Sequence, residues 1–210
     1  MVRKMRKNNF RKLSGITLAV FGVILISASV ATNLLQYSKK QEIIAAFDNT
    51  PGFEDIKEEL NIPVQSEQED KESDNSNTSD VLAEYILEIP CIDSLEPVVE
   101  GTDKNALSAA LGHEIDTALP GEVGNCVIAG HRNYTFGKYF NRLNEVEIGD
   151  MIYIHTPTEK YSYKVSEIKT VKPEEVEILE NTENEILTLY TCTPIYIATH
   201  RLVVIAERVL

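Results

Sequence analysis

Cysteine is scarce in this chain of 210 residues: there are three, Cys91, Cys126 and Cys192, and no CxxC pair. That spacing leaves little room for a zinc knuckle. An odd number cannot form a complete set of intramolecular disulfides, so at least one thiol is free or paired with another molecule. A second long apolar run is also missing, which predicts no more than one membrane span.

Basic residues are few outside the N-terminal region. The chain has 20 Lys and Arg, and eight of them lie within residues 1–40, which contain no Asp or Glu. The remaining 12 basic residues stand against 33 acidic ones. An acidic body repels a phosphate backbone, so nucleic acid is not an expected partner.

Residues 13–35 form an uncharged, mostly apolar stretch of 23 residues. At about 1.5 Å per residue a helix of this length crosses a bilayer core of about 30 Å. Residues 1–12 carry six basic side chains, so the positive-inside rule predicts a cytoplasmic tail, a single-pass anchor over 13–35 and an extracellular body in the cell membrane. The alternative is a secretory signal cleaved near Ser29-Val30-Ala31. Both readings export the rest of the chain.

Residues 36–80 are predicted to be an extracellular linker. Within it, residues 66–80 contain no apolar side chain, six acidic residues and one Lys. This composition buries too little surface to offset chain entropy, so we expect this part of the linker to be disordered.

Residues 81–210 are long enough for one folded domain with its own core. Their apolar runs predict about seven or eight short strands separated by turn residues. The expected strands are Tyr85–Ile92, Leu95–Val99, Cys126–Ala129, Met151–His155, Tyr161–Ile168, Ile186–Cys192 and Leu202–Val209. Two short helices are expected, Asp103–Leu111 with Thr102 or Asp103 as N-cap, and Phe136–Leu143. The fold class is therefore mainly β, a closed barrel or a sandwich.

Cys192 has the surroundings of a reactive thiol, because it ends an apolar strand where the chain turns out of the core at Thr193-Pro194. Arg201 opens the next strand, and an intervening turn would return it beside Cys192. A guanidinium there could lower the thiol pKa or hold a developing oxyanion. Cys91 and Cys126 lie in or beside apolar runs and are interpreted as small buried side chains.

A cysteine nucleophile needs an acid/base partner, and the chain has four histidines. His131 is favoured, because it leaves a predicted strand next to Gly130, which permits close approach of another segment. His113, in a predicted loop, and His200, beside Arg201, remain alternatives. His155 precedes Thr156-Pro157 and is expected at the surface.

Three segments resemble a known family. Residues 188–192 read TLYTC and match the TLxTC motif of sortases, the cysteine transpeptidases of Gram-positive bacterial surfaces. Residues 191–204, TCTPIYIATHRLVV, and residues 111–133, LGHEIDTALPGEVGNCVIAGHRN, resemble the flanking segments of class C and class D sortases. The three motifs occur in the family's order, and the resemblance covers most of residues 84–210.

The resemblance implies a closed β-barrel of about eight strands. It implies Cys192 as nucleophile, His131 as general acid/base and Arg201 as the group that binds substrate and oxyanion. It further implies that Ala129, Thr188 and Thr191 line the groove for the sorting signal. The implied reaction cleaves an LPxTG-like signal between Thr and Gly and passes the acyl group to an amine of a cell-wall precursor or a pilin.

Class D is favoured over class C, because neither an Asp-Pro-aromatic lid motif nor a second apolar span is present. The alternatives are a pilin-polymerising class C enzyme, a hydrolytic cysteine peptidase, and a non-catalytic exported barrel that binds peptides. The acidic stretch 174–185 lacks the spacing of a calcium-binding loop and is interpreted as solvated, although a divalent cation such as calcium or magnesium is left open. No other cofactor is expected.

Overall fold

The computed structural model describes residues 20–27, 29–31, 83–132 and 139–210. The chain divides into two compact units, residues 1–41 and 42–210, and each is described by itself. In the first unit, residues 20–27 and 29–31 are helical. Within the described ranges, no helix has the length and apolar character needed to cross a membrane. The predicted tail, most of the 13–35 segment and the 36–80 linker lie outside those ranges, so these expectations stay predictions.

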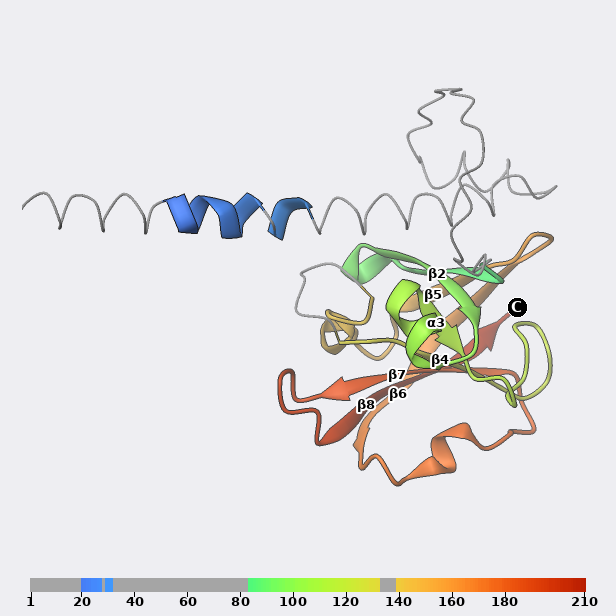
Figure 1. Ribbon diagram of the computed structural model, residues 1–210. Helices are drawn as coiled ribbons and strands as arrows, with labels where there is room; N and C mark the ends of the chain where they lie inside the picture. Colours follow the sequence, from blue (N-terminus) through green and yellow to red (C-terminus); the bar gives the residue numbers. More distant parts are fainter. Residues whose placement is uncertain (1–19, 28, 32–82, 133–138) are drawn as a thin grey trace, which may run out of the picture. The chain divides into compact units, whose positions relative to one another are not determined.

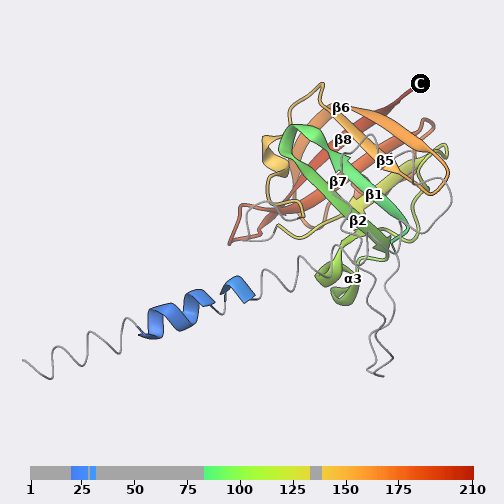
Figure 2. The ribbon, with the colours of Figure 1, turned by 90° about the horizontal axis from the view of Figure 1, so that it is seen from above.

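The second unit contains an eight-stranded closed barrel with the strand order β1-β2-β3-β4-β7-β8-β6-β5 (Figures 1 and 2). The strands are β1 (Tyr85–Ile89), β2 (Ser94–Glu100), β3 (Leu111–His113), β4 (Asn125–Ala129), β5 (Met151–His155), β6 (Lys160–Val171), β7 (Ile186–Thr193) and β8 (His200–Val209). The expected fold class, a mainly β closed barrel, is confirmed.

Two parallel pairings set this barrel apart from a simple up-and-down arrangement. Strand β2 pairs in parallel with β3, and β4 pairs in parallel with β7. The other neighbouring pairs are antiparallel. Because β4 and β7 run in the same direction, their C-terminal ends reach the same end of the barrel.

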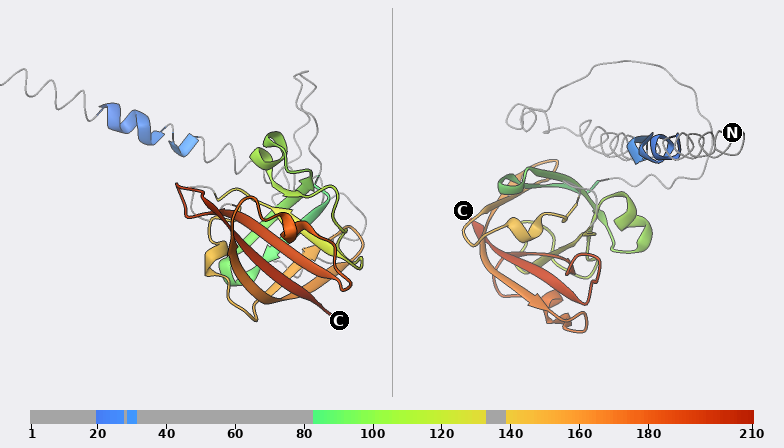
Figure 3. Two further views of the ribbon diagram at one scale, coloured as in Figure 1. Left: turned by 90° about the horizontal axis from the view of Figure 1, so that it is seen from below. Right: turned by 90° about the vertical axis from the view of Figure 1, so that its left-hand side faces the viewer.

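The barrel interior is filled by alternate side chains of its strands, as expected for a small barrel. Figure 3 shows the strands wrapped around this single interior. The central residues are almost completely buried, among them Leu87, Ile128, Ile152, Tyr163, Leu189 and Val204. Phe140, which follows the segment 133–138, is also fully buried in this core.

In the described part of the second unit, helical structure is confined to short pieces. These are α3 (Lys104–Ala109) and the 3-10 turns η1 (Pro90–Ile92), η2 (Leu143–Glu145) and η3 (Val176–Leu179). Asp103 caps α3, because its carboxylate accepts hydrogen bonds from the backbone N–H groups of Asn105 at 2.7 Å and Ala106 at 2.9 Å. The helix expected from Asp103 is therefore confirmed, with an end two residues earlier.

The second expected helix, Phe136–Leu143, is wrong where it can be checked. Residues 139–142 form turns, and only Leu143 enters a 3-10 turn. Residues 136–138 lie outside the described ranges. The backbone forms turns at 139–142 so that the side chains of Phe140 and Leu143 both enter the core, where they are fully buried.

Strand β1 is shorter than expected, and strand β3 was not predicted. Pro90 has no N–H to give to a ladder, so β1 ends at Ile89. Strand β3 has only three residues, and its Gly112 lies so close to the Gly101 carbonyl that a Cβ there would approach the oxygen to 2.3 Å. A three-residue strand centred on glycine carries no alternating pattern, which is why His113 was expected in a loop.

Candidate active site

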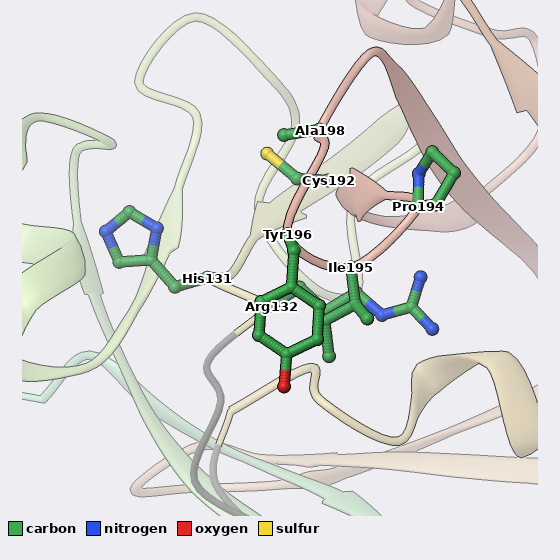
Figure 4. A pocket seen from close by; sticks show the side chains of 7 residues that line it. All are labelled: His131, Arg132, Cys192, Pro194, Ile195, Tyr196 and Ala198. Carbon is green, nitrogen blue, oxygen red and sulfur yellow. The ribbon is translucent and has the colours of Figure 1, made fainter.

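Cys192 lies near the end of β7, on the face opposite the core. Leu187 and Leu189 point into the barrel, and alternation along the strand turns Cys192 to the outer face. Its side chain is half-buried and unpaired. The thiol lines an open pocket of about 310 Å³, formed with His131, Arg132, Pro194, Ile195, Tyr196 and Ala198 (Figure 4).

Arg201 lies directly opposite Cys192, because these two residues are partners in the antiparallel β7–β8 ladder. The expectation that a turn returns Arg201 beside Cys192 is confirmed. The guanidinium donates to the His200 carbonyl oxygen at 3.2 Å and is not among the side chains that line the pocket. It therefore lies beside the thiol without occupying the space in front of it.

His131 comes from the end of β4, two residues beyond Ala129. In the parallel β4–β7 ladder, Ala129 is the partner of Tyr190. Two positions further along, the β4 segment reaches His131 and β7 reaches Cys192, so these two residues lie at the same level. The His131 side chain is exposed and lines the same pocket as Cys192. Figure 4 shows the imidazole on one side of the pocket, with the Cys192 sulfur pointing toward that side.

Gly130, just before His131, is packed tightly against the core and is hydrogen-bonded to β7. A Cβ at this position would come within 2.5 Å of both Leu111 and Phe140 side chains. The Gly130 N–H donates to the Tyr190 carbonyl at 3.2 Å, and the Thr191 hydroxyl donates to the Gly130 carbonyl at 2.7 Å. Two hydrogen bonds thus extend the contact between the β4 and β7 segments up to the positions just before His131 and Cys192.

None of the other three histidines lines this pocket, and two of them are buried elsewhere. His113 is fully buried at the end of β3, with Nδ1 3.0 Å from a Glu100 carboxylate oxygen and Nε2 3.1 Å from the Ala118 carbonyl oxygen. His155 is also fully buried and lies 2.8 Å from the Glu88 carboxylate, so its expected surface position is wrong. Among the four histidines, all of which the structure describes, His131 alone lines the pocket with Cys192.

Of the two remaining cysteines, one is buried as expected and the other is not. Cys126 is buried on β4 as expected, and burial raises the pKa of its thiol. Cys91 is exposed, which corrects the expectation of a buried side chain. It sits in the 3-10 turn η1 that Pro90 begins, and this turn carries the side chain out of the strand pattern.

Several residues of the site were not predicted as site residues from the sequence. Arg132 lines the pocket, with one guanidinium nitrogen donating to the Thr193 hydroxyl at 2.8 Å and another to the Asn144 side-chain oxygen at 2.7 Å. The β7–β8 connection adds an apolar wall of Pro194, Ile195 and Tyr196, in which Tyr196 is 76% exposed. Only the run of apolar residues after Cys192 could have indicated this wall.

Tyr190 forms a second polar group on the outer face of β7, two residues before Cys192. Its hydroxyl donates to the Glu114 carboxylate, whose other oxygen accepts from the Thr102 hydroxyl at 3.0 Å. Burial and the Glu114 carboxylate raise the pKa of Tyr190, while the nearby Arg201 charge acts in the opposite direction. The tyrosine therefore stays neutral in the working range of pH.

The expected groove residues Ala129, Thr188 and Thr191 are all buried, at 3%, 1% and 1% exposure. None belongs to the pocket that Cys192 lines. Ala129 and Thr188 lie on the outer-face side of β4 and β7, whereas the Thr191 hydroxyl is used on Gly130. Their contact with a sorting signal stays a prediction.

The acidic segment 174–185 contains η3, and most of its carboxylates are exposed, as expected of a solvated connection. It is fastened to the barrel by Asn125, whose side-chain nitrogen donates to the carbonyls of Ile178 at 2.9 Å and Glu180 at 3.0 Å. In the described ranges, no group of three or more His, Cys, Asp or Glu is arranged to hold a metal ion.

The arrangement is suited to nucleophilic catalysis. A thiol and an imidazole on one open pocket provide a nucleophile and a proton carrier. A permanently charged guanidinium beside the thiol provides a group able to stabilise negative charge on an attacked carbonyl oxygen.

Known proteins with similar sequences share one family name. The sequence model of the sortase domain matches residues 87–209. Sortase D of Bacillus subtilis is 36% identical over 113 residues, which are 53% of this chain and 55% of that protein. Sortase A of Staphylococcus aureus is 29% identical over 191 residues, 88% of this chain and 87% of that protein. The chain thus spans about half the length of the Bacillus protein.

Solved structures agree with the sequence matches. Sortase A from Corynebacterium diphtheriae has 36% identity and a TM-score of 0.60, covering 63% of each chain. A Clostridium perfringens Sortase D5 transpeptidase has 25% identity and a TM-score of 0.64, covering 82% of this chain and 99% of that one. The family match extends over more than half of the sequence and nearly all of the barrel that carries the pocket, so the chain belongs to the sortase family.

Proposed function

We propose that this chain is a cysteine transpeptidase of the class D sortase type. It would cleave an LPxTG-like sorting signal between Thr and Gly and transfer the acyl group to an amine of a cell-wall precursor. The observation that carries the proposal is the meeting of Cys192 and His131 on one pocket, with Arg201 opposite Cys192 in the β7–β8 ladder.

The first half of the reaction forms a thioester. With its proton transferred to His131, the Cys192 sulfur attacks the carbonyl carbon of the Thr residue, and the carbonyl oxygen takes the negative charge of the tetrahedral intermediate. Arg201 stabilises that charge. The C–N bond then breaks, and protonated His131 gives its proton to the leaving glycine amine.

The second half returns the enzyme to its starting state. The acceptor amine attacks the thioester carbonyl and loses a proton to His131, and the C–S bond breaks with release of the Cys192 sulfur. A new amide joins the sorted protein to the acceptor. The apolar wall of Pro194, Ile195 and Tyr196 on one side of the pocket supports this role, because partial exclusion of water favours an amine over hydrolysis.

Class D is favoured by two likenesses. Bacillus subtilis Sortase D is 36% identical to this chain, and the Sortase D5 structure covers 82% of it. The pilin-polymerising alternative also has support, because sortase C1 of Streptococcus agalactiae has 32% identity and a TM-score of 0.58. The acceptor distinguishes the two, being a peptidoglycan amine for class D and a pilin lysine for class C.

We also propose that residues 13–35 anchor the protein in the cell membrane, with the N-terminus in the cytoplasm and the barrel outside. This proposal rests on the 23 uncharged residues and on the six basic residues before them.

The acyl-enzyme is the species to look for. The full chain in detergent is incubated with LPxTG-type peptides and analysed by intact-mass spectrometry, with Cys192→Ala and Cys126→Ala beside it. We expect the wild type to gain the mass of the peptide up to its Thr, and hydroxylamine to remove it. Cys126→Ala should keep the adduct and lose about 1 kcal/mol of stability, because it removes a buried sulfur from the core. Cys192→Ala should show no adduct.

Arg201→Lys tests the charge-stabilising role in the same assay. A point charge cannot reproduce the planar guanidinium, so acylation should slow by about 10- to 100-fold. An adduct that survives Cys192→Ala would assign the nucleophile to another residue. No adduct across a panel of signal variants would argue instead for a peptide-binding barrel.

A further inference from the structure

Arg132 contacts the segment that carries the proposed nucleophile, although it belongs to the segment that carries the proposed acid/base. It directly follows His131 in sequence, and its guanidinium reaches the hydroxyl of Thr193, which directly follows Cys192, at 2.8 Å. Its second arm reaches Asn144 in η2 at 2.7 Å. One side chain thus joins the segment after β4, the end of β7 and the turn η2.

The hydroxyls on either side of Cys192 make matching contacts. Thr191 donates to the carbonyl of Gly130, just before His131, and Thr193 accepts from Arg132, just after it. Because side chains alternate along a strand, Thr191 and Thr193 share one face and Cys192 points to the other. Thr191 and Thr193 therefore flank Cys192 in sequence. Their hydrogen-bond partners, Gly130 and Arg132, flank His131.

Within the described residues, the His131 side chain makes no hydrogen bond or ion pair. It lies beyond the last residue of β4 and is exposed. The ladder between β4 and β7 ends before it, at the pair Ala129 and Tyr190. In the part of the chain that the structure describes, the Arg132–Thr193 contact joins the two segments at the residues that directly follow His131 and Cys192.

Resting on the proposed function, we infer that Arg132 is a positioning residue, which sets the separation of the His131 imidazole from the Cys192 sulfur through its contact with Thr193. A guanidinium suits this task, because its planar donors are always charged and hold two acceptors at fixed angles. Figure 4 shows the Arg132 side chain running away from the imidazole, so it acts on the backbone that carries His131.

The inference is tested in the full chain with Arg132→Gln, Thr193→Val and the double variant. Each single change should lower the rate constant of acyl-enzyme formation by about 10- to 100-fold with little change in KM, since a small misplacement of reacting groups costs that much. The double variant should be no slower than the slower single variant, because both changes remove one contact. Thr193→Ser, which keeps the acceptor oxygen, should recover most of the loss.

Arg208→Gln is the matched control. Arg208 also ties barrel segments, through Glu185 at 3.2 Å and the Ser162 carbonyl at 3.1 Å, but near the start of β7, about 20 Å from Cys192. Its loss should lower the melting temperature as much as the loss of Arg132 does, while acylation proceeds at the wild-type rate.

A second readout needs no sorting signal. Alkylation of Cys192 by iodoacetamide is followed by peptide mass mapping, with Cys91 of the same molecule as the internal reference. Arg132→Gln and Thr193→Val should shift the alkylation rate of Cys192 toward the rate that Cys192 shows in His131→Ala. The alkylation rate of Cys91 should stay unchanged. This readout separates failure of the inference from failure of the proposed function, because it holds even where no acyl-enzyme forms.

Three results would overturn the inference. The first is that Arg132→Gln is alkylated and acylated at the wild-type rates. The second is a rise in KM with an unchanged rate constant, which would assign the guanidinium to substrate binding. The third is a double variant whose loss is the product of the single losses, since independent contacts combine in that way.

Discussion

At the residue scale, the two accessible thiols of this protein have different surroundings. Cys192 lines the pocket, whereas Cys91 sits in the turn η1 near the Asp150 carboxylate. Partial burial of the sulfur, followed by the hydrogen bond and charge of Asp150, raises the pKa of Cys91 to about 11. Exposure alone therefore does not make Cys91 a nucleophile.

This pKa predicts a pH profile for Cys91. A thiol with a pKa of about 11 is deprotonated in only about one molecule in a thousand at pH 8, so alkylation should be slow there and rise about tenfold per pH unit until pH 11. Asp150→Asn removes the charge and should lower the pKa and speed alkylation at pH 8. Site-resolved mass mapping over a pH series measures both. A plateau below pH 9 in the wild type would contradict the prediction.

Residue types alone could not decide among the histidines. His113, His131 and His155 all follow or end short apolar runs, and the sequence pattern favoured His131 without excluding the others. The exclusion comes from burial: His113 and His155 are fully buried beside Glu100 and Glu88. A local pattern does not record a carboxylate from another strand, which is why the surface expectation for His155 failed.

At the element scale, α3 shows how far a local signal reaches. Asp103 before KNALSA predicted a helix start, and the structure confirms the N-cap with two backbone donors. The prediction of the end was less accurate, because the chain enters β3 at Leu111 to pair with Val98. Strand pairing across the barrel overrides the helical pattern there.

The cap of α3 provides a stability prediction. Asp103→Ala removes the acceptor for the N–H groups of Asn105 and Ala106, so the free energy of unfolding should fall by about 1 kcal/mol. Asp103→Ser, which can also cap, should lose less. Urea denaturation followed by circular dichroism measures the change, and the acylation rate should stay the same. Equal stability of Asp103→Ala and the wild type would show that the cap contributes nothing.

At the scale of the whole molecule, charge and hydropathy are divided along the chain. Eight basic residues and the uncharged stretch 13–35 lie in the first 40 residues, and the rest is strongly acidic. We expect the full chain to sediment with membranes, to resist extraction by alkaline carbonate and to dissolve in detergent, because an apolar segment of this length is stable in a bilayer.

A matched variant tests that expectation. The double variant Val23→Arg, Ile26→Arg should leave the carbonate-resistant fraction, because each charge at the centre of a span costs about 2.5–3.5 kcal/mol. Immunoblots of the membrane and soluble fractions measure the distribution. Release of the wild-type chain by carbonate would contradict the anchor.

The sequence by itself determined much of this protein. Alternating apolar residues predicted seven of the eight strands, and the TLYTC, TCTP and AGHR segments identified the family and named Cys192, His131 and Arg201. These inferences succeed because strand alternation and motif spacing are local properties of the chain. The three-residue β3, with Gly112 at its centre, has no such pattern and was missed.

Tertiary structure alone decided what the local patterns could not contain. The parallel pairing of β4 with β7 carries His131 to the level of Cys192, although about 60 residues separate them in sequence. The same pairing lets Arg132 reach Thr193. The turn η1 leaves Cys91 exposed, and the pairing of β1 with β5 brings Glu88 to the buried His155. These outcomes depend on which strands become neighbours when the barrel closes, and the free energy of that closure comes from the whole core at once.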